Sequence, residues 1–316
     1  MRHSFGAPLL ATMALVSALA VPAPADAWQA VTTASVRPAP ATLVLPDRDV
    51  ALQEGLDRIL RRPQFRSLVR QGRLSVALVD MSDPESLRYA ALDDDRERYA
   101  ASLPKIGILL GVFAQVDRGT MQYTPRLRNR LESMIRRSDN RISSELIRQV
   151  GFARIAETLR DPRHQLYDEG RSGGIWVGRG YGSGVGLWRR DPVGNQSHGA
   201  TARQAARFLV MMDQGGLVSP WASAEMKEIL GEPAINHKFV RGLSGRPDSR
   251  IYRKSGTWER WHADAALVER DGRKYVAVAL LDAPASVAGS SVLSDLIVHL
   301  DDLVHRSPRS EFQAQR

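Results

Sequence analysis

The chain of 316 residues contains no cysteine. A protein without cysteine has no disulfide, no thiolate metal site and no cysteine nucleophile, so the burial of apolar side chains has to hold it together. Lysine is also scarce: arginine fills most of the 44 basic positions, and lysine occurs at 105, 227, 238, 254 and 274. A lysine amine gives up its proton in an apolar site and an arginine guanidinium does not, so a retained lysine can mark a site that needs a base.

Long apolar runs are lacking outside the N-terminus. There, a basic start precedes an apolar stretch over about residues 9–21, and the tripeptide ADA follows at 25–27. This pattern is typical of a secretory signal peptide, and the stretch is short for a helix that spans a bilayer. We therefore expect residues 1–27 to be removed as a signal peptide; the alternative is an uncleaved membrane anchor. Cleavage predicts a periplasmic or secreted protein without a stable membrane anchor.

The remaining composition is that of a soluble globular protein. Hydrophobic residues make up 43% of the chain and charged residues 25%, with a mean hydropathy of -0.28, which argues against disorder. Residues 28–45 are rich in proline, alanine and threonine and predict a flexible leader. Residues 46–306 are expected to form the folded domain, and 307–316 a tail. The net charge of +9 favours anionic partners, but the arginines are scattered and we expect no nucleic acid partner.

Apolar periodicity gives the order of the secondary structure. Helical spacing occurs at 49–62, 103–119, 127–140, 141–151, 201–216, 220–230 and about 293–305. Apolar runs of strand length occur at 73–81, 87–94, 251–258, 263–270 and 274–282. Strands at both ends of the chain with helices between them predict one mixed α/β (α+β) domain. In it, an antiparallel sheet draws on both chain ends and the central helices form a second lobe.

Ser102 and Lys105 stand three residues apart where a predicted helix begins, so their side chains share a face about one turn apart. Pro104 suits a first helical turn, and the unpaired backbone N–H groups of a helix start favour developing negative charge. A serine hydroxyl there, beside an amine able to lose its proton, is the arrangement of an activated nucleophile. Alone, a Ser-x-x-Lys pattern also occurs at many ordinary helix starts.

Two further motifs follow in order. The sequence SDN occupies 138–140, at a break between predicted helices, and KSGT occupies 254–257 on a predicted strand. In this order and context, the motifs resemble those of the class A β-lactamases and penicillin-binding proteins, over roughly residues 50–305. The resemblance implies a β-lactamase/transpeptidase-like fold, with an antiparallel five-stranded sheet flanked by helices and an all-helical lobe. It implies neither a metal nor another cofactor.

The resemblance also implies a role for each motif residue. Ser102 would be the acylated nucleophile, and Lys105 would assist its deprotonation. Ser138 would pass a proton to the leaving nitrogen, and Asn140 would bind a side-chain amide of the substrate. The substrate carboxylate would be held by Lys254, Ser255 and Thr257. Backbone N–H groups of Ser102 and Thr257 would form the oxyanion hole.

The chain departs from the class A pattern in the step that hydrolyses the acyl-enzyme. Class A enzymes carry a Glu-x-x-x-Asn element after the second motif, and its glutamate activates the deacylating water. The nearest match here runs from Asp191 to Asn195, after a glycine-rich insertion. Asp191 is the first candidate for the base and Glu169 the second, and a plain loop residue is the alternative for each.

His262 follows the third motif on the neighbouring predicted strand. Class A enzymes often use an arginine to hold the substrate carboxylate near the motif lysine, and His262 is the candidate for that place here. A strand-end histidine without a function is the alternative. The lysines at 227, 238 and 274 are expected on the surface.

These features predict an exported serine hydrolase that forms an acyl-enzyme on Ser102. A class A-like β-lactamase is the first interpretation, and a D,D-carboxypeptidase or endopeptidase acting on peptidoglycan stem peptides is the second. A non-catalytic cell-wall-binding relative is the third, and the complete motif set disfavours it. The expected partner is therefore a small β-lactam or a stem peptide, and the rate of deacylation separates the two enzymes.

Overall fold

The computed structural model describes residues 43–182 and 186–306, and the structural statements below concern these residues. The signal peptide predicted at 1–27, most of the leader predicted at 28–45 and the tail predicted at 307–316 lie outside the described residues. Within the described ranges, no helix combines the length and the apolar character needed to cross a membrane.

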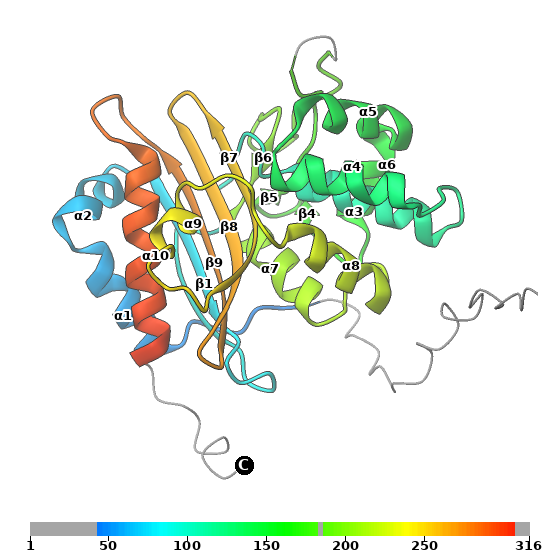
Figure 1. Ribbon diagram of the computed structural model, residues 1–316. Coiled ribbons are helices and arrows are strands. Elements are labelled where there is room, and N and C mark those ends of the chain that lie inside the picture. The colour runs from blue at the N-terminus through cyan, green and yellow to red at the C-terminus, as the bar shows by residue number, and fades with distance from the viewer. Residues whose placement is uncertain (1–42, 183–185, 307–316) are drawn as a thin grey trace, which may run out of the picture. The chain divides into compact units, whose positions relative to one another are not determined.

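A five-stranded antiparallel sheet joins the two ends of the folded chain (Figure 1). Its strand order is β2-β1-β9-β8-β7. The strands are β1 (Leu74–Asp80), β2 (Arg88–Leu92), β7 (Arg250–Trp258), β8 (Trp261–Arg270) and β9 (Arg273–Asp282). The central pairing of β1 with β9 joins the N-terminal and C-terminal parts, which confirms the predicted sheet. The strand with the third motif, β7, lies at an edge.

Both faces of the sheet are covered, because its central strands are apolar on both sides. Val276 and Val278 of β9 pack into one core cluster, and Ala277 and Ala279, which alternate with them, pack into the other. The first cluster includes α7 (Ala202–Asp213) and the helical lobe. The second includes α1 (Val50–Leu60), α2 (Pro63–Arg70), α9 (Phe239–Gly242) and α10 (Gly289–Arg306).

The central segment forms the predicted helical lobe. Its helices are α3 (Lys105–Asp117), α4 (Pro125–Arg136), α5 (Asn140–Val150), α6 (Phe152–Arg160) and α8 (Pro220–Leu230). The prediction did not include α2 and α6, because both are short and follow directly on the helix before them. Two pairs of short strands complete the fold, namely β3 (Arg98–Tyr99) with β6 (Gly199–Ala200), and β4 (Tyr167–Asp168) with β5 (Gly173–Gly174).

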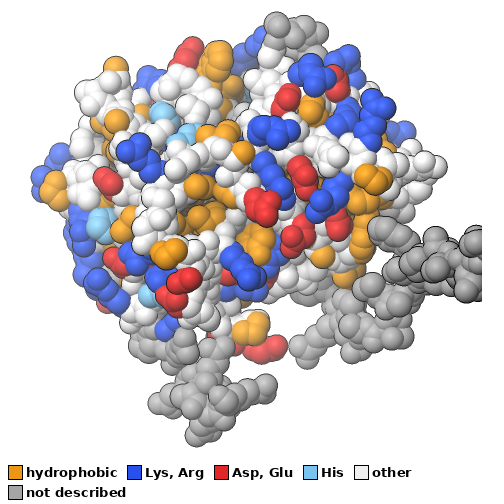
Figure 2. Space-filling view, viewed as in Figure 1, with side chains coloured by type: hydrophobic (Ala, Val, Ile, Leu, Met, Phe, Trp, Pro, Cys, Tyr) orange, Lys and Arg blue, Asp and Glu red, His pale blue; other side chains and the backbone are white. Residues whose placement is uncertain are grey.

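Basic side chains are dispersed over the surface rather than gathered. Figure 2 shows lysine and arginine side chains spread over one face, with acidic side chains among them. Many arginines form local pairs, such as Arg128 with Glu132 at 2.8 Å. The positive net charge therefore does not form one extended basic block on this face.

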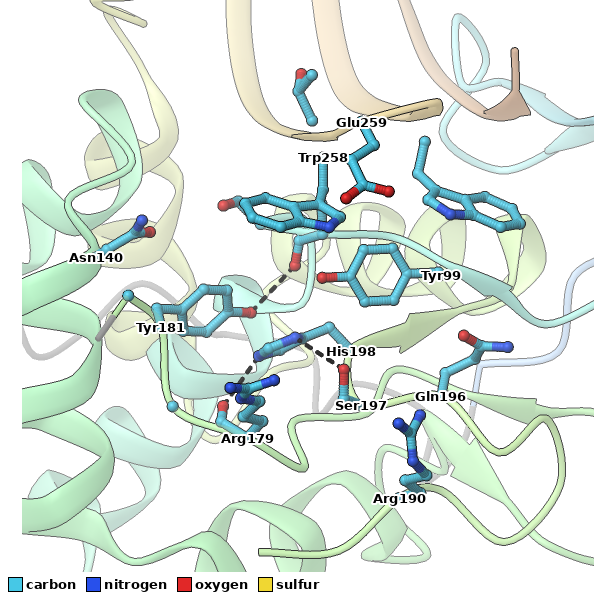
Figure 3. A pocket seen from close by; sticks show the side chains of 16 residues that line it. Tyr99, Asn140, Arg179, Tyr181, Arg190, Gln196, Ser197, His198, Trp258 and Glu259 are labelled. Carbon is cyan, nitrogen blue, oxygen red and sulfur yellow. Dashed lines mark hydrogen bonds between the residues drawn. The ribbon is translucent and has the colours of Figure 1, made fainter. Parts of the chain in front are cut away.

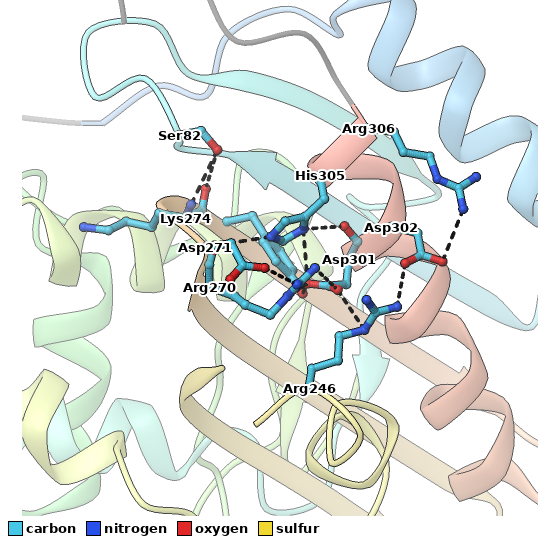
Figure 4. Close-up of polar contacts among 10 residues, drawn as sticks. Ser82, Arg246, Arg270, Asp271, Lys274, Asp301, Asp302, His305 and Arg306 are labelled. Carbon is cyan, nitrogen blue, oxygen red and sulfur yellow. Dashed lines mark hydrogen bonds and ion pairs between the residues drawn. The ribbon is translucent and has the colours of Figure 1, made fainter. Parts of the chain in front are cut away.

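Asp301 fastens α10 to the sheet from within the core (Figure 4). Its carboxylate is fully buried and accepts hydrogen bonds from Tyr275 Oη at 3.0 Å and Arg270 Nη2 at 2.8 Å. Arg246 Nε lies 3.1 Å from the same carboxylate. A buried carboxylate is tolerated when such donors surround it. The neighbouring Asp302 is partly exposed and pairs with arginines at the surface.

We expect Asp301→Ala to lower the free energy of unfolding by about 3 kcal/mol, because it leaves two arginines without their buried partner. Asp302→Ala is the matched control one residue away, and it should cost less than about 1 kcal/mol because it removes surface ion pairs. Urea unfolding of both variants near neutral pH measures the two losses. Equal losses would contradict the role assigned to Asp301.

Candidate active site

The first motif places a serine in a turn and a lysine in the core. The helix predicted over 103–119 begins at Lys105, so Ser102 lies in the turn that precedes α3. This turn is strained, since Ala101 has a φ of 50°, and such backbone strain is concentrated at functional sites. Lys105 is fully buried at the start of the helix.

Ser138 is the point where the three motifs meet. Its hydroxyl oxygen lies 3.2 Å from Lys105 Nζ and 3.0 Å from Lys254 Nζ. Lys105 Nζ also donates to the Ser138 carbonyl at 2.7 Å. Like Ala101, Ser138 has a positive φ, of 58°, which turns the chain sharply between α4 and α5. The structure therefore brings residues far apart in the sequence into direct contact.

Asp139 and Asn140 complete the second motif with different tasks. Asp139 caps α5, because its side chain accepts from the Ile142 N–H at 2.9 Å. Asn140 is exposed, and its Oδ1 accepts from Lys105 Nζ at 2.8 Å. With this oxygen engaged, the amide N–H groups of Asn140 are left to donate to another acceptor.

The third motif lies against the nucleophile turn. Lys254 is 1% exposed, and its Nζ donates to the Ser255 carbonyl at 2.7 Å as well as to Ser138. Gly256 has no room for a side chain: a Cβ there would stand 2.1 Å from the Ala100 carbonyl oxygen and 2.8 Å from the Ser102 nitrogen. The glycine therefore lets β7 approach the turn that carries Ser102.

Burial sets the charge of the two motif lysines. It lowers the pKa of Lys105 from 10.5 to about 7, and the charge of Asp139 opposes the shift. Burial, and next the positive charge of Lys105, lower the pKa of Lys254. The hydrogen-bond partners of both amines are hydroxyl, carbonyl and amide oxygens. An amine with a pKa near 7 is neutral in a large fraction of molecules at neutral pH, as a base must be.

Lys238 was expected on the surface, and that prediction is wrong because the side chain is fully buried. Its Nζ donates to Thr257 Oγ1 at 2.8 Å and to the Ala263 carbonyl at 3.1 Å. The segment before it is held by Arg253, which pairs with the buried Asp264 and donates to two carbonyls of that segment. Burial lowers the pKa of Lys238 to about 7. In the sequence, its one signal is the scarcity of lysine.

His262 lies on β8 opposite the third motif, on the strand where the sequence predicted it. It pairs with Thr257 in the register of the sheet, but its ring packs against Gly289, where a Cβ would stand 2.4 Å from it. It is not among the residues that line the cavity beside Ser102. Burial, and next the charge of Lys238, lower its pKa to about 4, so the ring is neutral at pH 7. The side chain that donates to the Thr257 hydroxyl is Lys238.

A cavity of about 650 Å³ opens beside Ser102 (Figure 3). One wall comes from the end of β7 and the turn after it, with Thr257, Trp258 and Glu259. The other wall comes from residues 179–182, 190 and 196–198. This volume lies in the range of roughly 300–1,000 Å³ found for small-molecule sites.

Comparison with known proteins agrees with this arrangement. The sequence model of the β-lactamase enzyme family matches residues 119–297, which is more than half of the chain. The chain belongs to the β-lactamase enzyme family. It is therefore a β-lactamase-like serine hydrolase. Its first motif precedes the matched residues in the sequence, and in the structure Lys105 of that motif contacts Ser138 within them. No curated protein gives a significant match.

Solved structures of β-lactamases and of PBP-A share the fold. A β-lactamase from Sphaerobacter thermophilus is 15% identical, with a TM-score of 0.63 over 81% of this chain and 99% of the other. The protein PBP-A is 19% identical, with a TM-score of 0.61 over 84% and 100%. A class A β-lactamase representative from Bacteroides cellulosilyticus is 14% identical, with a TM-score of 0.60 over 82% and 100%.

In this β-lactamase-family chain, Asp191 organises a turn and does not line the cavity. Its side chain is buried and accepts from the N–H groups of Val193 at 2.9 Å and Gly194 at 2.7 Å. It also accepts from the Tyr167 hydroxyl at 3.1 Å. Because these donors occupy its lone pairs, the geometry does not favour the predicted role of Asp191 in activating water.

Glu169, the second candidate for the base, lies on the surface. It forms an ion pair with Arg160 and does not line the cavity. The acid that does line the cavity is Glu259, in the turn between β7 and β8. Sequence position gave no signal for it, because its place depends on the contact between this turn and the nucleophile turn.

Glu97, five residues before the nucleophile, buries its carboxyl oxygens near the negative charge of Asp191. Its carboxyl group lies among Gly173, Gly194 and Gly199, where a Cβ would stand within 3.2 Å of it in each case. Burial, and next the charge of Asp191, raise the pKa of Glu97 from 4.5 to about 9. Glu97 therefore holds a proton at pH 7. Its carboxyl group packs against glycines of the segment that walls the cavity.

Tyr181 anchors the glycine-rich insertion beside Lys105. Its backbone N–H donates to Ser144 Oγ at 2.8 Å, and its carbonyl accepts from the same hydroxyl at 2.7 Å. Its own hydroxyl donates to the Ala101 carbonyl at 3.3 Å (Figure 3). Lys105 Nζ lies 4.5 Å from the centre of its ring, a cation–π distance. The insertion is thus tied to both α5 and the nucleophile turn.

We expect Glu97→Gln to change the pH dependence of stability. The folded chain keeps a proton on Glu97 that the unfolded chain releases above about pH 4.5, so the wild type loses stability as pH rises from about 4.5 to 9. The amide of a glutamine does not titrate and stays neutral at every pH in this window. The free energy of unfolding of Glu97→Gln relative to wild type should therefore rise by about 1 kcal/mol for each pH unit in this window.

Urea unfolding at about pH 5 and pH 8 measures this difference. Glu169→Gln is the control, because its carboxylate is exposed and ion-paired at the surface. The same stability difference at both pH values would show that Glu97 does not keep its proton in the folded chain.

Proposed function

We propose that this chain is an exported serine hydrolase that β-lactams acylate at Ser102 and that releases the acyl group slowly, as a penicillin-binding peptidase does. The proposal rests on the convergence of Lys105 and Lys254 on Ser138, beside the cavity that Ser102 lines. Export rests on the signal peptide pattern of residues 1–27.

Acylation begins with proton transfer from Ser102. Neutral Lys105 takes the hydroxyl proton as the oxygen bonds to the carbonyl carbon of the substrate. The backbone N–H groups of Ser102 and Thr257 stabilise the charge that develops on the carbonyl oxygen. The close approach of Gly256 to the nucleophile turn supports this pairing of donors from two elements.

Cleavage of the amide requires a proton on the leaving nitrogen, and Ser138 supplies it. A hydroxyl has two acceptor positions and one proton. The two lysines approach the Ser138 oxygen and occupy its acceptor positions, which leaves the O–H free to donate. Lys105, which has taken the proton of Ser102 and lies 3.2 Å from Ser138 Oγ, then passes that proton to Ser138, so the leaving group departs neutral.

The substrate carboxylate binds at the end of β7. Lys254 and Ser255 supply charge and a hydroxyl, and Thr257 supplies a second hydroxyl. Lys238 donates to Thr257 Oγ1, so the Thr257 O–H is directed to another acceptor. Lys238, rather than His262, is therefore the basic side chain behind the Thr257 hydroxyl.

Slow release of the acyl group is supported by the positions of the acids. Asp191 is engaged by its own turn, and Glu169 lies at the surface. Glu259 lines the cavity and favours a second candidate function, a class A-like β-lactamase in which Glu259 activates the deacylating water. A mutant of PBP-A, a structural relative 18% identical to this chain, was solved as an acyl-enzyme complex with penicillin G.

We expect a fluorescent penicillin to form an adduct on Ser102 that intact-protein mass spectrometry detects and that persists for minutes. Ser102→Ala should abolish the adduct, and Ser86→Ala, an exposed serine, should leave it unchanged. An adduct that survives Ser102→Ala would place the nucleophile elsewhere. Turnover of a chromogenic cephalosporin faster than about 1 s⁻¹, lost in Glu259→Gln, would establish the second candidate function.

The rate of acylation should follow the protonation of Lys105. Its amine acts as a base only when neutral, and burial lowers its pKa to about 7. The rate should therefore rise about tenfold per pH unit below pH 7 and level off above it. Labelling reactions that are quenched at set times, at pH values from about 5 to 9, give the acylation rate as a function of pH. A profile that is flat across this range would remove Lys105 from the role of base.

A further inference from the structure

The cavity extends beyond the groups that acylation uses. We call the part lined by Ser102, Asn140 and Thr257 its inner end, and the part lined by Tyr99, Arg179, Arg190 and residues 196–198 its outer end. A substrate whose carboxylate lies near Thr257 and whose acyl amide meets Asn140 directs its acyl side chain into the outer end. The chemistry of the outer end therefore selects the acyl side chain.

Two cations and one anion line this cavity, and they lie on opposite walls (Figure 3). Arg179 and Arg190 belong to one wall, and Glu259 belongs to the other. In the described part of the chain, no carboxylate pairs with the Arg179 guanidinium, which is exposed to the cavity. Arg190 donates to the Asn195 carbonyl at 3.1 Å, which leaves most of its N–H groups available.

Tyr99 lies between the two walls. Burial raises the pKa of its hydroxyl, the charge of Arg179 opposes that shift and the charge of Glu259 adds to it. The charges of Arg179 and Glu259 thus both act on the Tyr99 hydroxyl, which lies between the two walls. An anion is favoured on the side of Arg179, and a cation on the side of Glu259.

The backbone that carries Arg179 is fixed. Its carbonyl lies 2.9 Å from Nε2 of the buried His198, and Tyr181, two residues on, is tied to α5 by Ser144. The guanidinium is therefore presented from a rigid support. A planar guanidinium with free N–H groups binds a carboxylate through two parallel hydrogen bonds.

We propose that Arg179, supported by Arg190, binds a carboxylate carried by the acyl side chain of the substrate. The preferred substrate is then an acyl donor with an anionic side chain, either a β-lactam or a stem peptide with a free carboxylate in that position. This inference rests on the proposed function, because the acyl-enzyme on Ser102 fixes where the side chain lies.

Three penicillins provide the test, because they differ in one substituent on the same carbon. Benzylpenicillin carries hydrogen there, carbenicillin a carboxylate and ampicillin an ammonium group. The second-order rate constant for acylation of Ser102 is measured for each by intact-protein mass spectrometry. The wild type should react with carbenicillin about three- to tenfold faster than with benzylpenicillin, and the ratio should fall at high salt. Ampicillin should not share this advantage.

Arg179→Gln should lower the ratio of the carbenicillin rate to the benzylpenicillin rate to about one. Arg66→Gln makes the same change of charge at an exposed position of α2 and should leave the ratio as in the wild type. Thermal unfolding of both variants controls for folding. Equal rates for the three penicillins in the wild type, or an equal loss for all three in Arg179→Gln, would overturn the inference alone.

Absence of a Ser102 adduct with all three penicillins would overturn the proposed function, and this inference with it.

Peptides separate the two sources of the carboxylate. Diacetyl-L-Lys-D-Ala-D-Ala and its Nε-succinyl counterpart differ by one carboxylate on the side chain and compete with fluorescent penicillin. Stronger competition by the succinyl peptide, abolished in Arg179→Gln, assigns the site to stem peptides. Equal competition with a retained carbenicillin preference assigns it to β-lactams.

Discussion

Three lysine amines are buried in one region, and their hydrogen-bond partners are hydroxyl, carbonyl and amide oxygens. A buried cation without a carboxylate beside it is costly, and an amine lowers that cost by giving up its proton. The low pKa of Lys105 follows from this constraint. A carboxylate in contact with the amine would raise its pKa again and remove the base. The carboxylates near the site therefore cannot be in direct contact with the lysine amines.

The observed acids obey this constraint. Asp139 turns its carboxylate to the start of α5, and Asp264 is held by Arg253. Asp191 faces its own turn, where the N–H groups of Val193 and Gly194 donate to its carboxylate. Each carboxylate is satisfied by its own donors. The amines keep the low pKa that acylation requires, and the cost of their burial is offset by the apolar clusters on both faces of the sheet.

Close backbone approach is the second requirement of the site. The nucleophile turn, the turn at Ser138 and the end of β7 come from three separate parts of the chain. Gly256 lets two of them touch, and the positive φ values of Ala101 and Ser138 set the direction of the turns. Tyr181 then fixes the insertion onto the nucleophile turn. The outer wall with Arg179 is therefore built on a rigid support, which is what a selective binding site needs.

The sequence alone determined the strands and most helices, because apolar periodicity reports which faces are buried, and it identified three motifs whose order is characteristic of the family. It did not determine which acid or which cation reaches the cavity. The spacing of Asp191 predicts a base, but backbone N–H groups of its own turn occupy its side chain. Lys238 was predicted on the surface, because no local sequence pattern marks a buried lysine. These outcomes depend on contacts between segments distant in the chain, and packing of the tertiary structure decides them.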